Sequence, residues 1–180
     1  MRTATIVLVA YFLCVVVAAV WRYMPGFTHD AIPAIGALTA AYLGHTTRPF
    51  MLPVTAGVAI LGYLIDVISG TPAGLTSLVL GMTSDVARRT QRRLFVRGTS
   101  MMIGFSAFVS IMASLTQLIL RALFNVNKIG SAALELQQMA LVAIATALTG
   151  PLVWRLYRRI DAAFARTSRE RDAALEGLAP

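Results

Sequence analysis

The sequence contains little charge, one cysteine and two histidines, and each scarcity argues against a class of protein. Charged residues make up 13% of the chain, whereas soluble domains contain about 25%. A lone Cys14 excludes a disulfide framework or a cysteine-based metal site within one chain. His29 and His45 are expected in loops or at span ends, without a neighbouring metal ligand or nucleophile. We therefore expect no enzyme, no metal and no cofactor.

Long apolar runs dominate the chain, with 57% hydrophobic residues and a mean hydropathy of +0.72. Because a crossing takes about 20 residues, a chain of 180 residues accommodates six spans, short loops and a tail. The runs are continuous rather than alternating, which favours helices over a transmembrane barrel. We predict an all-α, polytopic membrane helix bundle. Its six spans are Thr3–Trp21, Ala31–Gly44, Met51–Ser69, Pro72–Ala87, Thr99–Leu120 and Gln138–Trp154.

The first span is expected to remain in the protein. The apolar stretch Thr3–Val20 is longer than the apolar region of a signal peptide, which has about 7 to 15 residues. Trp21 and Trp154 end the first and last spans. Both are predicted to be aromatic anchors at the membrane interface.

Basic residues predict the orientation, because cytoplasmic loops are enriched in lysine and arginine. The chain has 16 basic and 8 acidic residues. Six crossings that place the cluster Arg88–Arg97 in the cytoplasm leave only Arg22, Arg121 and Lys128 outside. We therefore expect both termini to be cytoplasmic. The basic flanks are expected to contact anionic phospholipid rather than nucleic acid.

The end of the chain differs in composition from the spans. Apolar residues recur at helical spacing over 156–164, among several arginines. This pattern predicts that the last span continues into an amphipathic helix on the cytoplasmic surface. The alternative is a solvated tail that only fixes topology. The chain thus divides into a transmembrane domain, 1–154, and a basic cytoplasmic tail, 155–180.

Asp66 is the acidic residue of greatest interest within a span. It precedes Gly70 by about one helical turn and is expected several ångströms inside the outer boundary. A carboxylate at mid-membrane costs about 2.5 to 3.5 kcal/mol, and such a residue usually faces the bundle interior and has a partner. Asp66 is either a functional group or an acceptor for free amides of the turn Gly70–Gly74. The glycines suit a tight reversal, and Pro72 is predicted in the first turn of the next helix.

A polar stripe is predicted on one face of the fifth span. It consists of Ser106, Ser110, Ser114 and Gln117. The stripe should face other helices, and it leads to Arg121 at the outer end. Because Asp66 and Arg121 are expected at similar depth, we predict an ion pair between them.

Small residues form stripes on two other spans. They are Gly36, Ala40 and Gly44 on the second span, and Gly74, Ser77 and Gly81 on the fourth. Such stripes allow helices to approach closely, either within the bundle or at a partner interface. Asp85 lies three and four residues before Arg88 and Arg89, a spacing that predicts a local ion pair.

Several short motifs follow one another along the chain. They are Asp30-Ala31-Ile32-Pro33, the Arg48-Pro49 turn, Gly62-x-x-x-Asp66, Gly70-Thr71-Pro72-Ala73-Gly74-Leu75, a basic cluster ending at Arg93, and Trp154-Arg155-Leu156-Tyr157-Arg158-Arg159. In this order they resemble the bacterial rod shape-determining MreD family. The resemblance in topology covers most of the chain, and the resemblance in local motifs covers a smaller part of it. Ala73, where the family commonly has a bulky apolar residue, and a long tail depart from the pattern.

The resemblance implies a non-enzymatic inner-membrane scaffold of the cell-elongation (rod) complex, required for cell shape and sidewall peptidoglycan synthesis. It implies MreC as the partner, with RodA and a transpeptidase as further members and MreB as an indirect one. It also implies a bundle that resembles the substrate-binding subunits of energy-coupling-factor transporters.

Two other functions remain open. A solute-binding transporter subunit needs a polar cavity, which Asp66, Gln117, Arg121 and the serine stripe could line. An intramembrane serine protease needs a histidine beside its nucleophile, and neither His29 nor His45 is expected in a span core.

Overall fold

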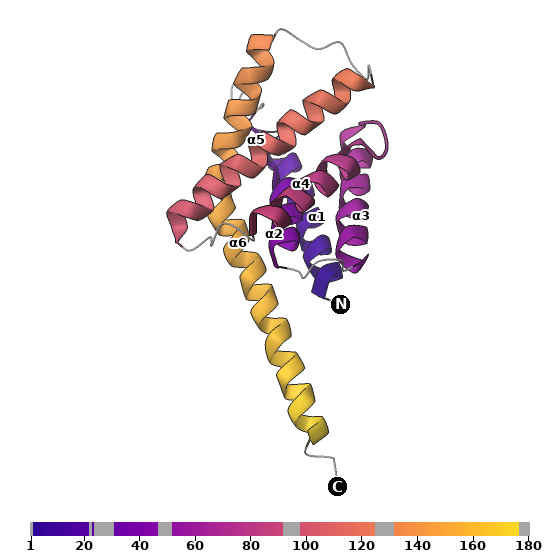
Figure 1. Ribbon diagram of the computed structural model, residues 1–180, viewed down its shortest axis with the longest axis vertical. Helices are drawn as coiled ribbons and strands as arrows, with labels where there is room; N and C mark the ends of the chain where they lie inside the picture. Colours follow the sequence, from indigo (N-terminus) through magenta and orange to yellow (C-terminus); the bar gives the residue numbers. More distant parts are fainter. Residues whose placement is uncertain are drawn as a thin grey trace.

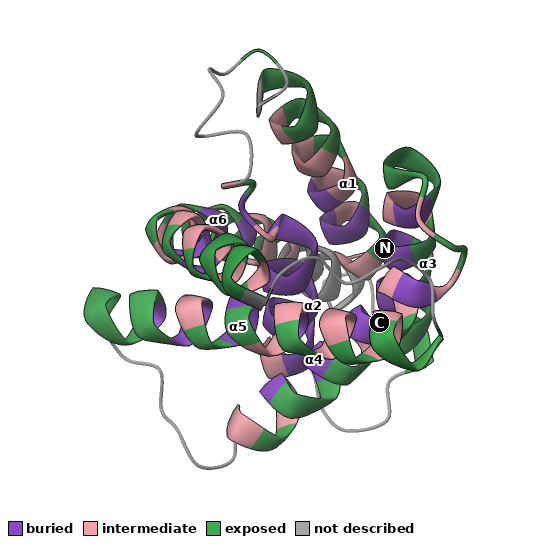
Figure 2. Cartoon of the chain, turned by 90° about the horizontal axis from the view of Figure 1, so that it is seen from above, coloured by how far each residue is buried: buried purple, intermediate pink, exposed green. Residues whose placement is uncertain are grey.

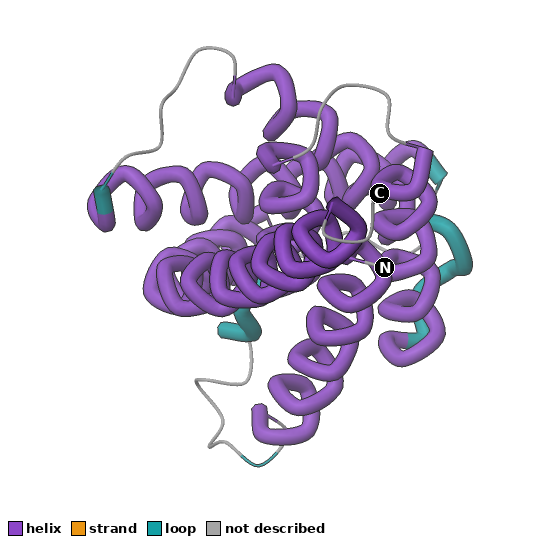
Figure 3. Tube along the Cα trace, turned by 90° about the horizontal axis from the view of Figure 1, so that it is seen from below, coloured by secondary structure: helices purple, strands orange, loops and turns teal. Residues whose placement is uncertain are grey.

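The chain forms six helices in the computed structural model, which describes residues 2–21, 23, 31–46, 52–91, 98–124 and 132–176 (Figure 1). The helices are α1 (Arg2–Trp21), α2 (Ile35–Thr46), α3 (Leu52–Ser69), α4 (Leu75–Gln91), α5 (Thr99–Leu123) and α6 (Ala132–Glu176). The described residues contain no strand (Figure 3). The predicted all-α class is therefore confirmed.

Some residues used in the predictions lie outside the described part of the chain. They are Arg22, His29, Asp30, Arg48, Pro49, Met51, Arg92, Arg93, Arg97 and Lys128, together with the side chains of Trp21, Arg169 and Arg171.

The short helix α2 lies at the centre of the bundle. All ten residues from Ile35 to Gly44 are buried, and α2 packs against each of the other five helices. Figure 2 shows buried residues on α2 and on faces of the surrounding helices. A helix of 12 residues is about 18 Å long, whereas the hydrocarbon core is about 30 Å thick. Because protein encloses α2, its backbone needs no match to the bilayer.

The start of α1 and the middle of α6 meet at one end of the bundle. The first helix begins with Arg2, which contacts Asp161 of α6. At the opposite end, the α3–α4 turn lies beside Leu120 of α5. We refer to these as the Arg2 end and the Gly70 end.

The outer faces of the bundle are apolar. Leu8 of α1 is 68% exposed and Leu148 of α6 is 74% exposed, among many similar side chains. Within the described residues, four segments are long and apolar enough to cross a membrane. They are Arg2–Val20, Leu52–Ser69, Thr99–Leu123 and Ala133–Thr167. Of the six helices in the described residues, α1, α3, α5 and α6 are therefore long and apolar enough to cross a membrane, whereas α2 and α4 are too short.

The last helix is longer than the predicted span Gln138–Trp154. Its 45 residues form one helix about 68 Å long, which projects from the bundle beyond the Arg2 end (Figure 1). The predicted helical continuation is confirmed, but it follows the axis of the span. Packing also extends past Trp154, because Tyr157 is fully buried. The boundary predicted after residue 154 therefore falls inside the packed bundle.

Candidate functional site

Asp66 fastens the turn between α3 and α4. Its side chain is 1% exposed. Oδ1 accepts a hydrogen bond from the Thr71 hydroxyl at 2.7 Å, and Oδ2 accepts one from the Gly74 amide at 2.9 Å. The Thr76 amide donates to both oxygens at 3.1 and 3.2 Å. Of the two predicted roles, the structure shows Asp66 as the acceptor for the turn amides.

Two predictions about this turn are wrong. Asp66 and Arg121 form no ion pair, because the turn itself occupies both carboxylate oxygens. Pro72 does not lie in the first turn of α4, which begins at Leu75. Gly70 and Gly74 have φ angles of 65° and 97°, so the reversal uses left-handed backbone that only glycine adopts readily. Pro72 therefore belongs to the turn, and α4 begins three residues later, at Leu75.

The serine stripe of α5 divides into two parts. Ser106 and Ser110 are fully buried, and the Ser106 hydroxyl donates to the Met102 carbonyl at 2.7 Å. Ser106 also lies against Gly150 of α6, where an added Cβ would be 2.1 Å from its Oγ. Ser114 and Gln117 are half-buried. The prediction that the stripe faces other helices is confirmed at its buried half.

Close packing involves some of the predicted small residues. A Cβ added at Gly44 would be 2.4 Å from the Ser84 carbonyl oxygen, and one at Gly36 would be 2.7 Å from Ile65. The prediction for α2 is therefore confirmed. Gly81 of α4 differs, because a Cβ there would meet nothing within 4 Å. Gly81 is not a close-packing position.

Gly62 of α3 makes a close approach to Ser77 of α4, which belongs to the predicted stripe, whereas Gly62 itself was not part of a stripe. A Cβ added there would be 2.4 Å from the Ser77 Cα atom. This backbone contact leaves no room for a side chain. The predicted local pair at the end of α4 is present, with 3.7 Å between Arg88 Nη1 and Asp85 Oδ1.

A network of Arg2, Tyr42 and Asp161 joins α1, α2 and α6 at the Arg2 end. Arg2 Nε donates to Asp161 Oδ1 at 2.6 Å, and its Nη2 donates to Oδ2 at 2.5 Å. The Tyr42 hydroxyl donates to the same Oδ2 at 2.5 Å. Bidentate guanidinium–carboxylate contacts are among the stronger hydrogen bonds. Sequence reasoning missed this network, although Asp161 is the only acidic residue between Arg158 and Arg166.

Trp154 lies inside the bundle, so its predicted role as an interfacial anchor is wrong. It is 4% exposed. Its ring contacts those of Tyr42, His45 and Phe105, with centroids 5.1, 5.6 and 5.9 Å away. Close by, the hydroxyls of Thr39 and Tyr157 are 2.7 Å apart. Aromatic rings from three helices thus support the network around Asp161.

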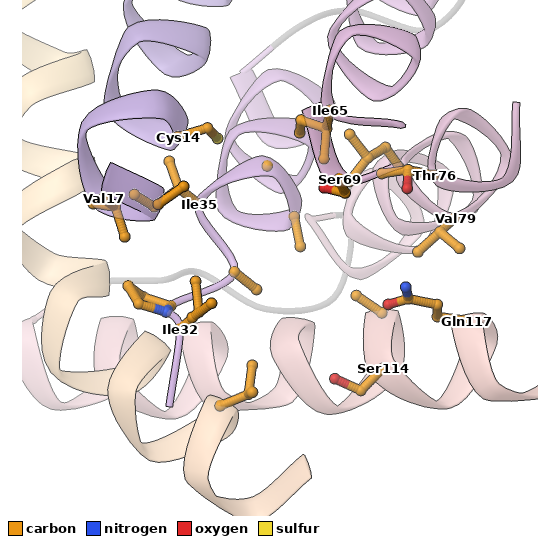
Figure 4. A pocket seen from close by; sticks show the side chains of 18 of the residues that line it. Cys14, Val17, Ile32, Ile35, Ile65, Ser69, Thr76, Val79, Ser114 and Gln117 are labelled. Atoms are coloured by element: carbon orange, nitrogen blue, oxygen red, sulfur yellow. The ribbon is translucent and has the colours of Figure 1, made fainter. Parts of the chain in front are cut away.

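A cavity of about 420 Å³ lies near the Gly70 end and is lined by residues of all six helices (Figure 4). Its lining includes Cys14, Ile35, Ile65, Val79, Gln117 and Val142. Ser114 also lines it, whereas Asp66 and Arg121 do not. Of the residues from which the sequence predicted a solute cavity, only Ser114 and Gln117 line this pocket.

Two apolar grooves open on the outside of the bundle. The α1/α3 groove, of about 670 Å³, is lined partly by Ala4, Ala56 and Gly57. A second groove, of about 630 Å³, lies beside the α3–α4 turn and includes Leu78 and Phe124.

The predicted site residues thus fall into separate regions. Asp66, Gly70 and Gly74 build the turn, Ser106 and Ser110 pack between helices, and Ser114 and Gln117 line the cavity. In the described part of the chain, no group of three or more His, Cys, Asp or Glu side chains could hold a metal ion. No family model, no curated protein and no solved structure matches this chain.

Proposed function

We propose that this protein is a non-enzymatic inner-membrane scaffold of the cell-elongation complex, in the manner of the MreD family. The observation that carries the proposal is that two of the motifs, Gly62-x-x-x-Asp66 and the turn Gly70–Leu75, form one packed unit. Gly62 lies against Ser77, and Asp66 binds the turn up to Thr76. These motif residues therefore build a rigid helical hairpin, as a scaffold requires.

The proposal includes an orientation with the Arg2 end in the cytoplasm. Arg88, Arg89, Arg155, Arg158 and Arg159 belong to the helical segments at this end. Basic residues are enriched on the cytoplasmic side of membrane proteins. With the Arg2 end inside, the projecting part of α6 extends into the cytoplasm, where anionic phospholipid lies beside its base.

A scaffold also needs a surface for the transmembrane helix of a partner, and we assign this role to the α1/α3 groove. Its lining runs from Arg2 to Tyr11 on α1 and from Pro53 to Leu64 on α3. It thus extends along both helices. Small side chains at such a surface let another helix approach closely. In this proposal the groove receives the transmembrane helix of MreC, which links the protein to RodA, the transpeptidase and, indirectly, MreB.

Co-purification tests the assignment. Ala56→Leu should fill the groove and reduce the amount of MreC recovered with the protein from solubilised membranes. Ala140→Leu, at an exposed position on α6, is the matched control and should leave recovery unchanged. Failure of the unaltered protein to recover MreC would contradict the scaffold proposal. Equal recovery of MreC by the two variants would reject the assignment of the groove but not the scaffold proposal.

A solute-binding membrane subunit of the energy-coupling-factor type is the second candidate. The cavity near the Gly70 end favours it, because ligand sites are concave, mostly apolar and contain a few polar groups. This function predicts that a vitamin-like solute raises the melting temperature of the purified protein. It also predicts that depletion impairs uptake of that solute without rounding the cells.

A further inference from the structure

The cavity near the Gly70 end has an apolar wall and a polar edge. Val17, Ile32 and Ile35 contribute to the apolar wall. Ser114 and Gln117 come from α5 on the other side, where Ser69 and Thr76 are also near (Figure 4). The volume of about 420 Å³ falls within the range of roughly 300–1,000 Å³ that small-molecule sites occupy.

The polar edge contains side chains whose hydrogen-bonding groups are unpaired in the part of the chain that the structure describes. Within the described residues, the side chains of Ser114 and Gln117 make no hydrogen bond with another protein group. A carboxamide offers two donors and one acceptor oxygen. Polar groups in an apolar setting are usually paired. Gln117 is therefore equipped to bind the head of a ligand.

Among the residues that the structure describes, the lining includes no acidic or basic side chain. Asp66 is close along α3, but its oxygens are bound by the turn. A charged ligand would lose its hydration here without gaining an opposite charge. A neutral ligand therefore suits the described part of the lining.

We propose that this cavity binds a neutral amphiphile with one hydrogen-bonding head and an aliphatic body, such as a long-chain alcohol. The head binds the Gln117 carboxamide and the Ser114 hydroxyl, while the aliphatic body packs against α1 and α2. This inference rests on the cavity alone and does not depend on the scaffold proposal.

Photolabelling with 3-azioctanol, a neutral photoreactive alcohol, tests the inference. The protein is reconstituted in phosphatidylcholine vesicles, and labelled residues are mapped by mass spectrometry. We expect saturable labelling of lining residues such as Cys14 and Val142. Octanol should compete, whereas octyltrimethylammonium at equal membrane concentration should not.

Variants separate the cavity from the lipid face. Gln117→Leu should weaken labelling about three- to tenfold, as expected for the loss of one hydrogen bond. Gln137→Leu, an exposed glutamine on α6, is the matched control and should change nothing. Val142→Phe should block the cavity. Unchanged thermal unfolding shows that each variant is folded, and Val142→Phe provides a second test if Gln117→Leu fails to fold.

Three results would overturn the inference. One is non-saturable labelling confined to lipid-facing residues such as Leu148 and Leu152. Another is equal labelling of the Gln117→Leu and Gln137→Leu proteins. The third is cavity labelling by a photoreactive phosphatidylcholine that octanol does not displace, since the occupant would then be a phospholipid acyl chain.

Discussion

The guanidinium of Arg2 donates two hydrogen bonds to the carboxylate of Asp161, although the two residues are 159 positions apart. This contact fixes the start of α1 to α6 beyond the predicted end of the last span. Because Tyr42 donates to the same carboxylate, three helices meet at one acceptor. The Arg2 end is thus fixed by one network, as Asp66 fixes the Gly70 end.

We predict that Asp161→Ala lowers the free energy of unfolding by about 1–3 kcal/mol, because it leaves Arg2 and Tyr42 without their acceptor. Chemical or thermal unfolding in a mild detergent measures the change. Asp85→Ala is the control, since the Asp85 side chain is 66% exposed and contacts Arg88 at 3.7 Å. Exposed pairs contribute about 1 kcal/mol or less. Equal losses in the two variants would contradict the importance of the network.

Asp66→Ala should be more damaging, with a loss of about 3 kcal/mol or more, because several buried donors lose their acceptor. Asp66→Asn retains one acceptor oxygen and should lie between the wild type and Asp66→Ala. Thermal unfolding of the purified variants provides the comparison.

The charge-swapped double variant Asp66→Arg with Arg121→Asp separates the turn from an ion pair. It should show no rescue relative to Asp66→Arg alone, because the structure pairs Asp66 with the turn. Recovery of stability in the double variant would instead support the ion pair between Asp66 and Arg121 that was predicted from their similar depth.

Glycine substitutions should have opposite effects at two positions. Gly62→Ala should destabilise the protein by about 1–3 kcal/mol, since the new methyl group would collide with the backbone at Ser77. Gly81→Ala, in open space within α4, should be neutral or stabilising by up to about 1 kcal/mol because alanine favours helix. Melting temperatures of both variants measure these effects. Equal losses of stability in Gly81→Ala and Gly62→Ala would contradict the close contact between Gly62 and Ser77.

The orientation predicts which added cysteines are labelled in intact cells, in a Cys14→Ser background. Ala73→Cys, in the exposed turn at the Gly70 end, should react with a membrane-impermeant maleimide. Ala163→Cys, exposed on α6 near the Arg2 end, should react only after the cells are opened. The reverse pattern would invert the topology.

The sequence was sufficient for the helical class and for the reversal after Asp66, although not for the start of α4. Continuous apolar runs predicted the helices, and the spacing of Asp66 and the glycines predicted the reversal, because both depend on local chemistry. Ser106 and Ser110 were also predicted to face other helices, since polar side chains are disfavoured toward lipid. These features depend on neighbours in sequence or on the choice between lipid and protein.

Other features depend on how the helices are arranged. Hydropathy does not reveal that α2 is central or that Trp154 faces inward, because lipid and a protein core are similarly apolar. The Arg2–Asp161 contact joins opposite ends of the chain, and no local pattern indicates it. Ala56, Gly57 and Ala4 likewise form one groove only once α1 lies beside α3.

The most direct test of the central proposal is cell shape after depletion of the protein. We predict that depleted rod-shaped cells become round, and that the wild type and Ala140→Leu restore the rod shape. Ala56→Leu should restore it poorly despite normal membrane levels. Depleted cells that grow as normal rods would contradict the proposed role in cell elongation.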